Sequence, residues 1–503
     1  MLFNSYVFIF AFLPAALAGY FALGRIGFGG ATKLWLIGAS CFFYGWWSVP
    51  FLGLLLASIA FNYGCGQAIR HLVHAERAPV RLVLTLAIAA NLGVLAWFKY
   101  ATFIVDNLRA VSGLDIEVGA IVLPLAISFY TFQQIAYLVD CSRRRVAEHG
   151  FLDYAVFVTF YPQLIAGPIL HHSEIMPQFR RSRQRFRHED FAAGVAFFVI
   201  GLVKKIVLAD SVSALADPVF RSGAGASYGC LDAWIAVLAV TVRIYFDFSG
   251  YSDMAVGLAR MLGIRLPYNF NSPYQAVSII DFWRRWHITL SRFLRDYVYI
   301  PLGGNRRGPG RRYLNLVATM LLGGLWHGAG WTFVVWGGLH GFYLLVNHAW
   351  QALQRRLAGT VWALQLPAPA GRMLTLAAVL IAWVFFHAES FEQALTVLGA
   401  MAGRDGSESF LHGWVFTELA RGGRPAVDVQ ARLLLLLLAI AIALFAPNSQ
   451  TMIDGRATLA TAGRPRAWFA WRPSAAWAAV LVLAFLITLT QMSKVKAFIY
   501  FQF

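Results

Sequence analysis

Long apolar runs recur along nearly the whole chain and constrain its fold more than any other feature. A helix that crosses the hydrocarbon core of a bilayer needs about 20 mostly apolar residues. Runs that reach or approach this length lie near residues 3–23, 33–48, 51–69, 82–98, 118–139, 191–209, 230–247, 313–346, 372–386, 432–447 and 474–491. They predict an all-α, polytopic membrane protein with about eleven or twelve spanning helices.

The composition of the chain supports a membrane location. Hydrophobic residues make up 59% of the 503 residues and charged residues only 13%, whereas an ordinary soluble domain has roughly 45–50% apolar and about 25% charged residues. A disordered, collagenous or typical cytosolic protein is therefore excluded. We expect a single membrane-embedded domain over residues 1–503, with N-terminal helices in 1–150, a core in 151–346 and C-terminal helices in 347–503.

The basic residues are concentrated between the apolar runs. The 42 Lys and Arg residues exceed the 24 Asp and Glu residues, which gives a net charge of +18. Short basic segments between apolar runs are typical of cytoplasmic loops in multi-pass membrane proteins, so we expect membrane lipids and no nucleic acid as partners. The first run contains Ala16-Leu17-Ala18, but nothing basic precedes it. We therefore interpret it as a retained span rather than a cleaved signal.

Residues 151–170 form an apolar stretch that differs from the other runs. Pro162 and Gly167-Pro168 interrupt it, and both of its flanks are basic, at Arg143–Arg145 and Arg180–Arg187. The two basic flanks predict that the chain enters and leaves the membrane on the same side. Non-helical backbone at membrane depth is tolerated only where protein buries it or water reaches it. We therefore expect this re-entrant stretch to form a wall of a cavity.

The segment from Asp281 to Tyr299 is predicted to be one amphipathic helix, because its large apolar side chains recur at helical spacing. These side chains are Phe282, Trp286, Leu290, Phe293 and Tyr297. A second face carries Arg284, His287, Ser291 and Arg295. One interpretation is an interfacial helix with a solvated basic face. The other is that this face lines an opening for an anionic substrate, since arginine suits phosphate recognition.

Between Tyr313 and Val346 only two side chains titrate near neutrality, His327 and His340. Ionisable groups at membrane depth are costly and by default suggest function, although a histidine can also serve only to hold neighbouring helices together. We favour a functional role for His327, and for His340 both roles stay open. One straight helix would place the two about 140° apart around its axis, so we do not expect them to share a metal ion.

Several sequence motifs of metal and nucleotide binding are missing. The chain contains no HExxH, Walker A or GxGxxG pattern and no CxxC pair, so we expect no metal site, no bound cofactor and no ATP-driven pump. A buried neutral imidazole remains, and it suits general-base work because its unperturbed pKa lies near 6.5. For Asp247 two roles stay open, orienting a histidine or capping the next helix. Lys204 and Lys205 are expected to reach the membrane interface.

Several longer motifs occur together in this chain. They are Asn91 to Gly93 with Phe98 to Tyr100, Leu123 to Gln133, Tyr161 to Pro168, Tyr245 to Asp253, Asp281 to His287, Leu325 to Gly328 and the ending Phe498 to Phe503. With these motifs the chain resembles the membrane-bound O-acyltransferase family, and within it the bacterial branch that includes the alginate O-acetylation membrane protein. The resemblance extends over nearly the whole chain.

The resemblance implies a fold and a set of site residues. The implied fold is a helical bundle around a pore in a bacterial inner membrane. The family's catalytic histidine falls on His327, and its second, less uniform polar position falls on His287. One position departs from the family pattern, because His387 stands where related proteins tend to have arginine.

The resemblance also implies a reaction. Similar proteins take an acetyl group from a cytoplasmic donor, acetyl-CoA, and pass it through the membrane for O-acetylation of an exported polysaccharide such as alginate, together with a separate periplasmic acetyltransferase. As a hypothesis, His327 takes the proton of an acceptor hydroxyl while His287 orients the acceptor or polarises the carbonyl. The face with Arg284, Ser291 and Arg295 would attract the phosphates of the donor.

Two other classes of protein fit the composition. One is a transporter that moves a saccharide or a lipid-linked saccharide without acyl transfer, and the other is a purely structural subunit of an export complex. Carriers often show paired interrupted helices in two halves, and we find no such pairing. A structural subunit would leave His327 and His287 without a role.

Overall fold

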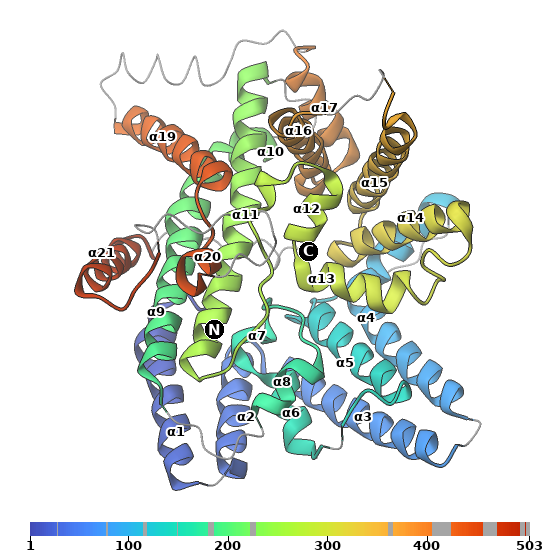
Figure 1. Cartoon of the computed structure of the whole chain (residues 1–503), viewed down its shortest axis with the longest axis vertical. Coiled ribbons are helices and arrows are strands. Elements are labelled where there is room, and N and C mark those ends of the chain that lie inside the picture. The colour runs from blue at the N-terminus through green and yellow to red at the C-terminus, as the bar shows by residue number, and fades with distance from the viewer. Residues whose placement is uncertain are drawn as a thin grey trace. The chain divides into compact units, whose positions relative to one another are not determined.

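The computed structural model describes residues 1–27, 29–76, 79–113, 118–147, 149–179, 186–221, 228–360, 366–404, 424–455, 470–492 and 498. Every regular element within these ranges is a helix (Figure 1), so the predicted all-α fold class is confirmed. Two parts of the predicted motifs lie outside the described residues, namely 180–185 of the basic flank and 499–503 of the ending.

The chain forms two compact units that interleave along the sequence. Unit 1 comprises residues 1–201, 251–268 and 472–492, and unit 2 comprises residues 202–250, 269–471 and 493–503. The long helix α11 (Cys230–Met261) contributes its first part to unit 2 and its last part to unit 1. The division into N-terminal helices, core and C-terminal helices stays a prediction.

Unit 1 contains most of the N-terminal half of the chain. Its elements are the π-helix η1 (Phe8–Phe12), α1 (Leu13–Ile26), α2 (Gly29–Gly45), α3 (Val49–His74), α4 (Val80–Ser112), α5 (Ile127–Ser142), α6 (Phe151–Thr159), α7 (Tyr161–Leu164), α8 (His172–Phe179), nearly all of α9 (His188–Leu202) and α21 (Ala475–Gln491). Helix α1 has Pro14 in its first turn and ends at Gly27, whose φ of 81° is left-handed. Both residues suit these positions, because proline presets the first turn and glycine has no Cβ to clash.

The stretch 151–170 in unit 1 is interrupted, as its proline and glycine residues predict. The helix breaks at Phe160, whose ψ of 104° is not helical. A Cβ atom at Gly167 would collide with the backbone of Gln163, so the chain can fold back here only with glycine. Nearly all residues of this stretch are buried. Burial satisfies the condition for irregular backbone at membrane depth, while the role in lining a cavity stays a prediction.

Unit 2 contains the segments that carry the candidate site residues. Its elements are the π-helix η2 (Val203–Asp210), η3 (Ser213–Leu215), α10 (Asp217–Phe220), the first part of α11, η4 (Pro273–Gln275), α12 (Ile279–Arg285), α13 (Ile288–Leu294), the π-helix η5 (Arg295–Tyr299), α14 (Gly308–His327), α15 (Trp331–Leu357), α16 (Ala368–His387), α17 (Phe391–Met401), α19 (Arg424–Phe445) and α20 (Ser449–Asp454).

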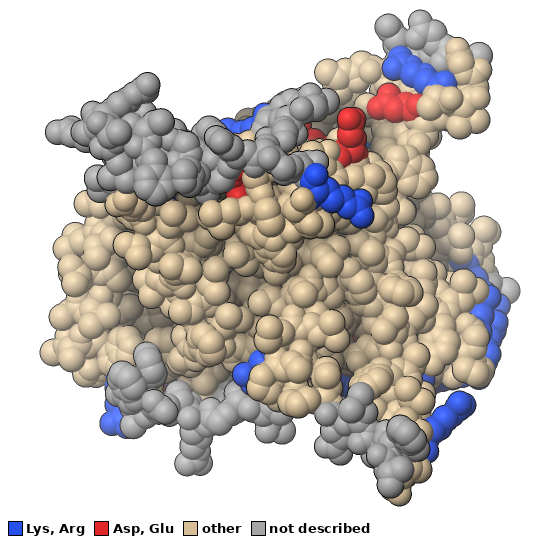
Figure 2. All heavy atoms as spheres, turned by 90° about the horizontal axis from the view of Figure 1, so that it is seen from above, with Lys and Arg blue, Asp and Glu red and all other residues tan. Residues whose placement is uncertain are grey.

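Five described helical segments are long and apolar enough to cross a membrane. They are Phe8–Ile26, Val49–His74, Val80–Ser112, His188–Leu215 and Ala368–His387, and two shorter apolar helices are Val429–Phe445 and Ala475–Gln491. The face seen in Figure 2 consists mostly of side chains without charge. The protein is therefore a membrane protein with several spanning helices, and the full number of eleven or twelve spans stays a prediction.

Two apolar runs have helix bounds that differ from the predicted ones. Within the run 118–139 the helix α5 begins only at Ile127, because Ala126 has a left-handed φ of 64°. Helix α11 continues beyond Asp247 to Met261. The polar residues that end the apolar run after Asp247, Ser249 and Ser252 among them, are buried within the helix, so polarity there does not mark a helix end.

A buried ion cluster in unit 2 corrects the prediction for Lys205. Its Nζ atom lies 2.8 Å from Oδ1 of Asp210 and 2.8 Å from Oδ1 of Asp247. The exposed fractions of the three side chains are 4%, 5% and 0%. The prediction that Lys205 reaches the membrane interface is therefore wrong, because two carboxylates hold its ammonium group inside the protein. Pairing of this kind is what a buried charge requires.

Candidate active site

The predicted amphipathic helix over 281–299 consists of three pieces instead of one. The backbone leaves α12 at Trp286 and enters α13 after His287, which has left-handed angles of φ 41° and ψ 53°. Few residues other than glycine adopt this conformation. Two backbone hydrogen bonds hold the break, one from Ile288 N to Asn269 O and one from Asn271 N to Arg285 O, both 2.9 Å long. The apolar periodicity continues across the break, which explains why the sequence predicts one helix.

The break directs His287 into the interior of unit 2. Its side chain has no exposed surface, and its ring lies edge-on to Phe248 with ring centroids 4.7 Å apart. This segment lies outside the candidate spans. Burial lowers the pKa of His287 to about 3, because a charged imidazolium loses its hydration there. His287 is therefore neutral at physiological pH and does not belong to a solvated basic face.

His327 is the last residue of α14, where the chain turns back into α15. The two helices pack closely: a Cβ atom at Gly324 would collide with the carbonyl oxygen of Phe333, and one at Gly337 with that of Met320. Glycine thus permits an approach that a larger residue would prevent. The hairpin buries His327 to 3% exposure and fixes its position at the turn.

The structure brings the two histidines implied by the family resemblance together. The ring centroids of His287 and His327 are 6.4 Å apart, with the rings inclined by 60°. Aromatic rings surround His327, since the centroids of Trp326, Trp336 and Phe386 lie 4.9, 5.0 and 5.3 Å from its own. The result is a pair of buried imidazoles in an aromatic enclosure. A neutral imidazole in such a place can accept a proton.

His340 lies on the same side of α15 as Trp336, one helical turn further along. Its Nδ1 accepts a hydrogen bond of 3.3 Å from Nε1 of Trp283, and its ring centroid is 4.8 Å from that of Trp336. The sequence motifs and the charge pattern do not point to Trp283 or Trp336 as site residues. The spacing of four residues between Trp336 and His340 was the available signal, because it places two side chains on one helix face.

The three residues predicted to bind the donor lie in different surroundings. Arg284 is exposed at the end of α12, whereas the Ser291 hydroxyl donates to the carbonyl oxygen of Trp286 at 3.3 Å. Arg295 donates two hydrogen bonds to the carboxylate of Asp296, at 2.7 and 3.1 Å. Among the three, only Arg284 lines the open pocket beside α12. The joint role of the three residues in donor binding therefore stays a prediction.

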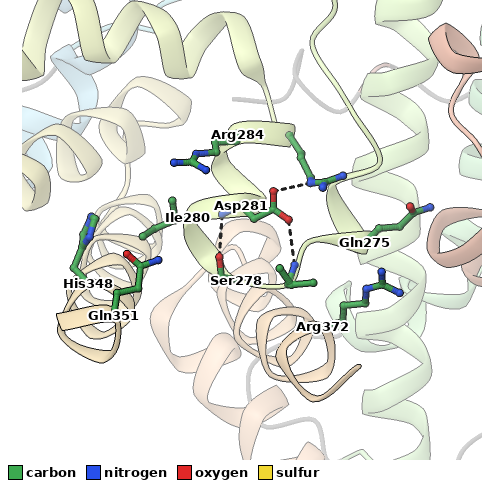
Figure 3. Close-up of a pocket in the computed structure, with 10 residues that line it drawn as sticks. Gln275, Ser278, Ile280, Asp281, Arg284, His348, Gln351 and Arg372 are labelled. Carbon is green, nitrogen blue, oxygen red and sulfur yellow. Dashed lines mark hydrogen bonds and ion pairs between the residues drawn. The ribbon is translucent and has the colours of Figure 1, made fainter. Parts of the chain in front are cut away.

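An open pocket of about 510 Å³ lies beside α12 in unit 2 (Figure 3). It is lined from three helices by Asp281, Arg284 and Arg285 of α12, His348 and Gln351 of α15 and Arg372 of α16. The carboxylate of Asp281 is bound internally, since Oδ1 accepts from Arg285 Nε at 2.8 Å and Oδ2 from Val277 N at 3.2 Å. Arg284 and Arg372 form no ion pair with any described residue.

The surroundings of His348 add positive charge to this pocket. Burial, followed by the charges of Arg312 and Arg355, lowers the pKa of His348, and Nη2 of Arg312 lies 3.2 Å from its Nδ1. Cations nearby disfavour a further positive charge on the imidazole. The pocket therefore combines guanidinium groups with a neutral histidine, a set of groups that suits an anionic ligand. Among the described residues, no three His, Cys, Asp or Glu side chains are arranged to hold a metal ion.

Comparison with known proteins identifies the family. Residues 142–388 match the sequence pattern of the membrane-bound O-acyltransferase family, a range that includes α12 to α16 and both histidines. The chain is 45% identical over 433 residues to the peptidoglycan O-acetyltransferase of Helicobacter pylori, covering 81% of this chain and 80% of that protein.

Two further relatives are probable alginate O-acetylases named AlgI. The protein of Azotobacter vinelandii is 40% identical over 450 residues, covering 88% of this chain and 84% of the relative. The protein of Pseudomonas aeruginosa is 42% identical over 435 residues, covering 85% and 79%. The chain is thus similar to these relatives over most of its length. Its structure has an all-α membrane fold and a buried pair of histidines. The chain belongs to the membrane-bound O-acyltransferase family.

Proposed function

We propose that this O-acyltransferase transfers an acetyl group from acetyl-CoA on the cytoplasmic side of the bacterial inner membrane to a cell-surface polysaccharide such as alginate or peptidoglycan. The relatives are named for O-acetylation of these polymers, and the chain is similar to them over most of its length. The observation that carries the proposal is the pair of buried imidazoles of His287 and His327, whose centroids lie 6.4 Å apart.

The chemistry assigns different roles to the two histidines. Neutral His327 accepts the proton of an acceptor hydroxyl as the hydroxyl oxygen attacks the thioester carbonyl carbon. The new C–O bond forms while the carbonyl π electrons move to oxygen. When the tetrahedral intermediate collapses, the C–S bond breaks and the imidazolium of His327 returns its proton to the thiolate. His287 orients the acceptor, and its low pKa keeps it neutral so that it does not compete for the proton.

The arginine-lined pocket supports a phosphate-bearing donor. Arg284 and Arg372 lie on two different helices at this pocket and form no ion pair with a described residue. CoA carries phosphate groups, and guanidinium groups bind phosphate with two parallel hydrogen bonds. We assign these two arginines to the donor phosphates, with Ser291 and Arg295 left as further candidates.

A polysaccharide acceptor outside the membrane calls for a second protein. The acetyl group must leave the enclosure around His327 before it reaches a polymer, and a periplasmic acetyltransferase would complete the transfer. This partner and the inner-membrane location follow from the family resemblance. His387 lies at the end of α16, and its ring packs edge-on against Phe220 with centroids 4.8 Å apart, so it packs within unit 2 as an aromatic residue.

Radiolabelled acetyl-CoA tests the proposed function. Combined with the periplasmic acetyltransferase and an acceptor oligosaccharide, the purified full chain in detergent or nanodiscs should release CoA thiol from acetyl-CoA and pass the label on to that oligosaccharide. His327→Ala should do neither while remaining folded. A transporter without acyl-transfer chemistry would leave the thioester intact in the wild-type protein, and this result would overturn the proposal.

A further inference from the structure

Helix α15 carries two buried N–H groups that the roles given above leave unused. Trp336 and His340 are separated by one helical turn, and their side chains have exposed fractions of 1% and 0%. Nε1 of Trp336 and Nε2 of His340 have no hydrogen-bond partner among the described residues. Buried polar atoms normally have a partner, and each exception needs an explanation.

The hydrogen bond from Trp283 determines which nitrogen of His340 carries the proton. An indole Nε1 can only donate, so Nδ1 of His340 must accept the 3.3 Å bond and cannot itself be protonated. In the neutral ring the proton is then on Nε2. His340 therefore presents an N–H donor at Nε2, and Trp336 presents a second N–H donor at Nε1.

Trp336 belongs to the aromatic enclosure of His327, and His340 packs against Trp336. The ring centroids of Trp336 and His340 are 4.8 Å apart, and the centroid of Trp336 is 5.0 Å from that of His327. A carbonyl group placed for attack beside His327 is therefore next to the ring of Trp336. Two fixed donors beside a general base form the arrangement that stabilises the oxyanion of an acyl transfer.

We propose that Trp336 Nε1 and His340 Nε2 donate hydrogen bonds to the oxyanion that forms from the acetyl carbonyl. This inference rests on the proposed acyl transfer at His327. When the acceptor oxygen attacks, the C=O π electrons move to the carbonyl oxygen, and the two N–H groups bind the negative charge there. The double bond re-forms as the C–S bond breaks and the thiolate leaves with the proton from His327. Trp283 is a positioning residue, because it fixes the tautomer of His340.

Five substitutions separate this role from a packing role, and one of them, Trp283→Phe, removes the donor to Nδ1 of His340. Trp336→Phe keeps an aromatic ring and removes the N–H. His340→Asn keeps an acceptor near Nδ1 for Trp283 and removes the donor near Nε2, whereas His340→Gln keeps a donor near Nε2. Trp97→Phe, a change of the same kind at a side chain that is 60% exposed on α4, is the matched control. Initial rates are measured with purified full-length protein, the periplasmic acetyltransferase, radiolabelled acetyl-CoA and an acceptor oligosaccharide.

The expected result is a loss of kcat with little change in KM. Removing one oxyanion donor lowers kcat by roughly 10²–10³-fold in known enzymes, so we expect this loss for Trp336→Phe and for His340→Asn. His340→Gln should lose less than His340→Asn. Trp283→Phe should also lower kcat, and Trp97→Phe should match the wild type. Thermal unfolding of each purified variant reports its folded fraction, to which the rates are normalised.

The outcomes distinguish this inference from the proposed function. Trp336→Phe and His340→Asn could each have the wild-type kcat per folded molecule while His327→Ala is inactive. This result would overturn the oxyanion role and leave His327 as the general base. Equal losses in His340→Asn and His340→Gln would also overturn it, because the donor would then not matter. Activity in His327→Ala would instead contradict the proposed function itself.

Discussion

His287 and His327 belong to different helical segments of the chain, yet their imidazole centroids lie 6.4 Å apart. His287 reaches this position because it adopts a left-handed backbone conformation between α12 and α13, and His327 because it ends α14 at a tight hairpin. The site therefore depends on two backbone features, the break after α12 and the close approach of α14 and α15. Each of them can be tested separately.

The close approach of α14 and α15 predicts the effect of a single added methyl group. Gly337→Ala should separate the helices and displace His327, because the new Cβ would collide with the carbonyl oxygen of Met320. We expect acetyl transfer to fall at least about tenfold, since a small misplacement of a catalytic group can cost that much. The neighbouring Gly338→Ala is the control, because its Cβ would lie 3.6 Å from Leu321 Cδ2, an ordinary contact. Equal activity of the two variants would contradict the prediction.

The ion cluster around Lys205 predicts a loss of stability. Lys205→Met would leave the carboxylates of Asp210 and Asp247 buried without their cation, and breaking a buried ion pair in this way costs about 3–5 kcal/mol. We expect a lower thermal unfolding temperature in detergent. The triple variant Lys205→Met, Asp210→Asn, Asp247→Asn should recover part of the loss, because no buried charge is left unpaired. If Lys205→Met is as stable as the wild type, the prediction that this ion cluster stabilises the protein is wrong.

The pocket beside α12 predicts a change in donor affinity. Arg284→Ala and Arg372→Ala should each raise the KM for acetyl-CoA several-fold with little change in kcat, because they bind the donor away from the reacting carbonyl. The KM of the wild type should also rise with salt concentration more than that of the double variant. Arg356→Ala, an exposed arginine of α15 outside the pocket, is the control. An unchanged KM in the double variant would place the donor phosphates elsewhere.

The burial of His287 predicts how stability depends on pH. Its pKa is about 3 in the folded protein and about 6.5 in an unfolded chain, so the unfolded state binds more protons between these values. The free energy of unfolding should therefore fall as the pH decreases below about 6.5. His287→Asn removes the titrating group and keeps a residue that tolerates left-handed backbone. Thermal unfolding between pH 4.5 and 7.5 should show a weaker pH dependence in this variant, and an identical dependence would contradict the account.

Much of the fold could be predicted from the sequence, because the thickness of the bilayer sets the number of apolar residues that a spanning helix needs. The α3 and α16 helices fall where the apolar runs predict them. His327 could be selected because a titratable side chain in a long apolar segment is rare. Its neighbour His287 needed the family resemblance, since periodicity alone placed it on an exposed basic face.

The remaining features depend on contacts between distant residues. The left-handed conformation of His287 is held by Asn269 and Asn271, and no local pattern marks it. Lys205 is held inside the protein by Asp210 and by Asp247, which lies far along the chain. The N–H donor at Nε2 of His340 follows only from the hydrogen bond that Trp283 donates to Nδ1 of the same ring. Such pairings are tertiary and cannot be read from composition or spacing.

The O-acetyl content of the polysaccharide reports directly on whether His327 acts as the general base. The polysaccharide O-acetyl content is compared in cells of the native bacterium that carry the wild-type chain or His327→Ala as their only copy, with the amount of protein in the membrane measured in parallel. If His327 is the general base, His327→Ala reaches the membrane at the wild-type level and the O-acetyl groups disappear. Unchanged O-acetylation with His327→Ala would contradict this role.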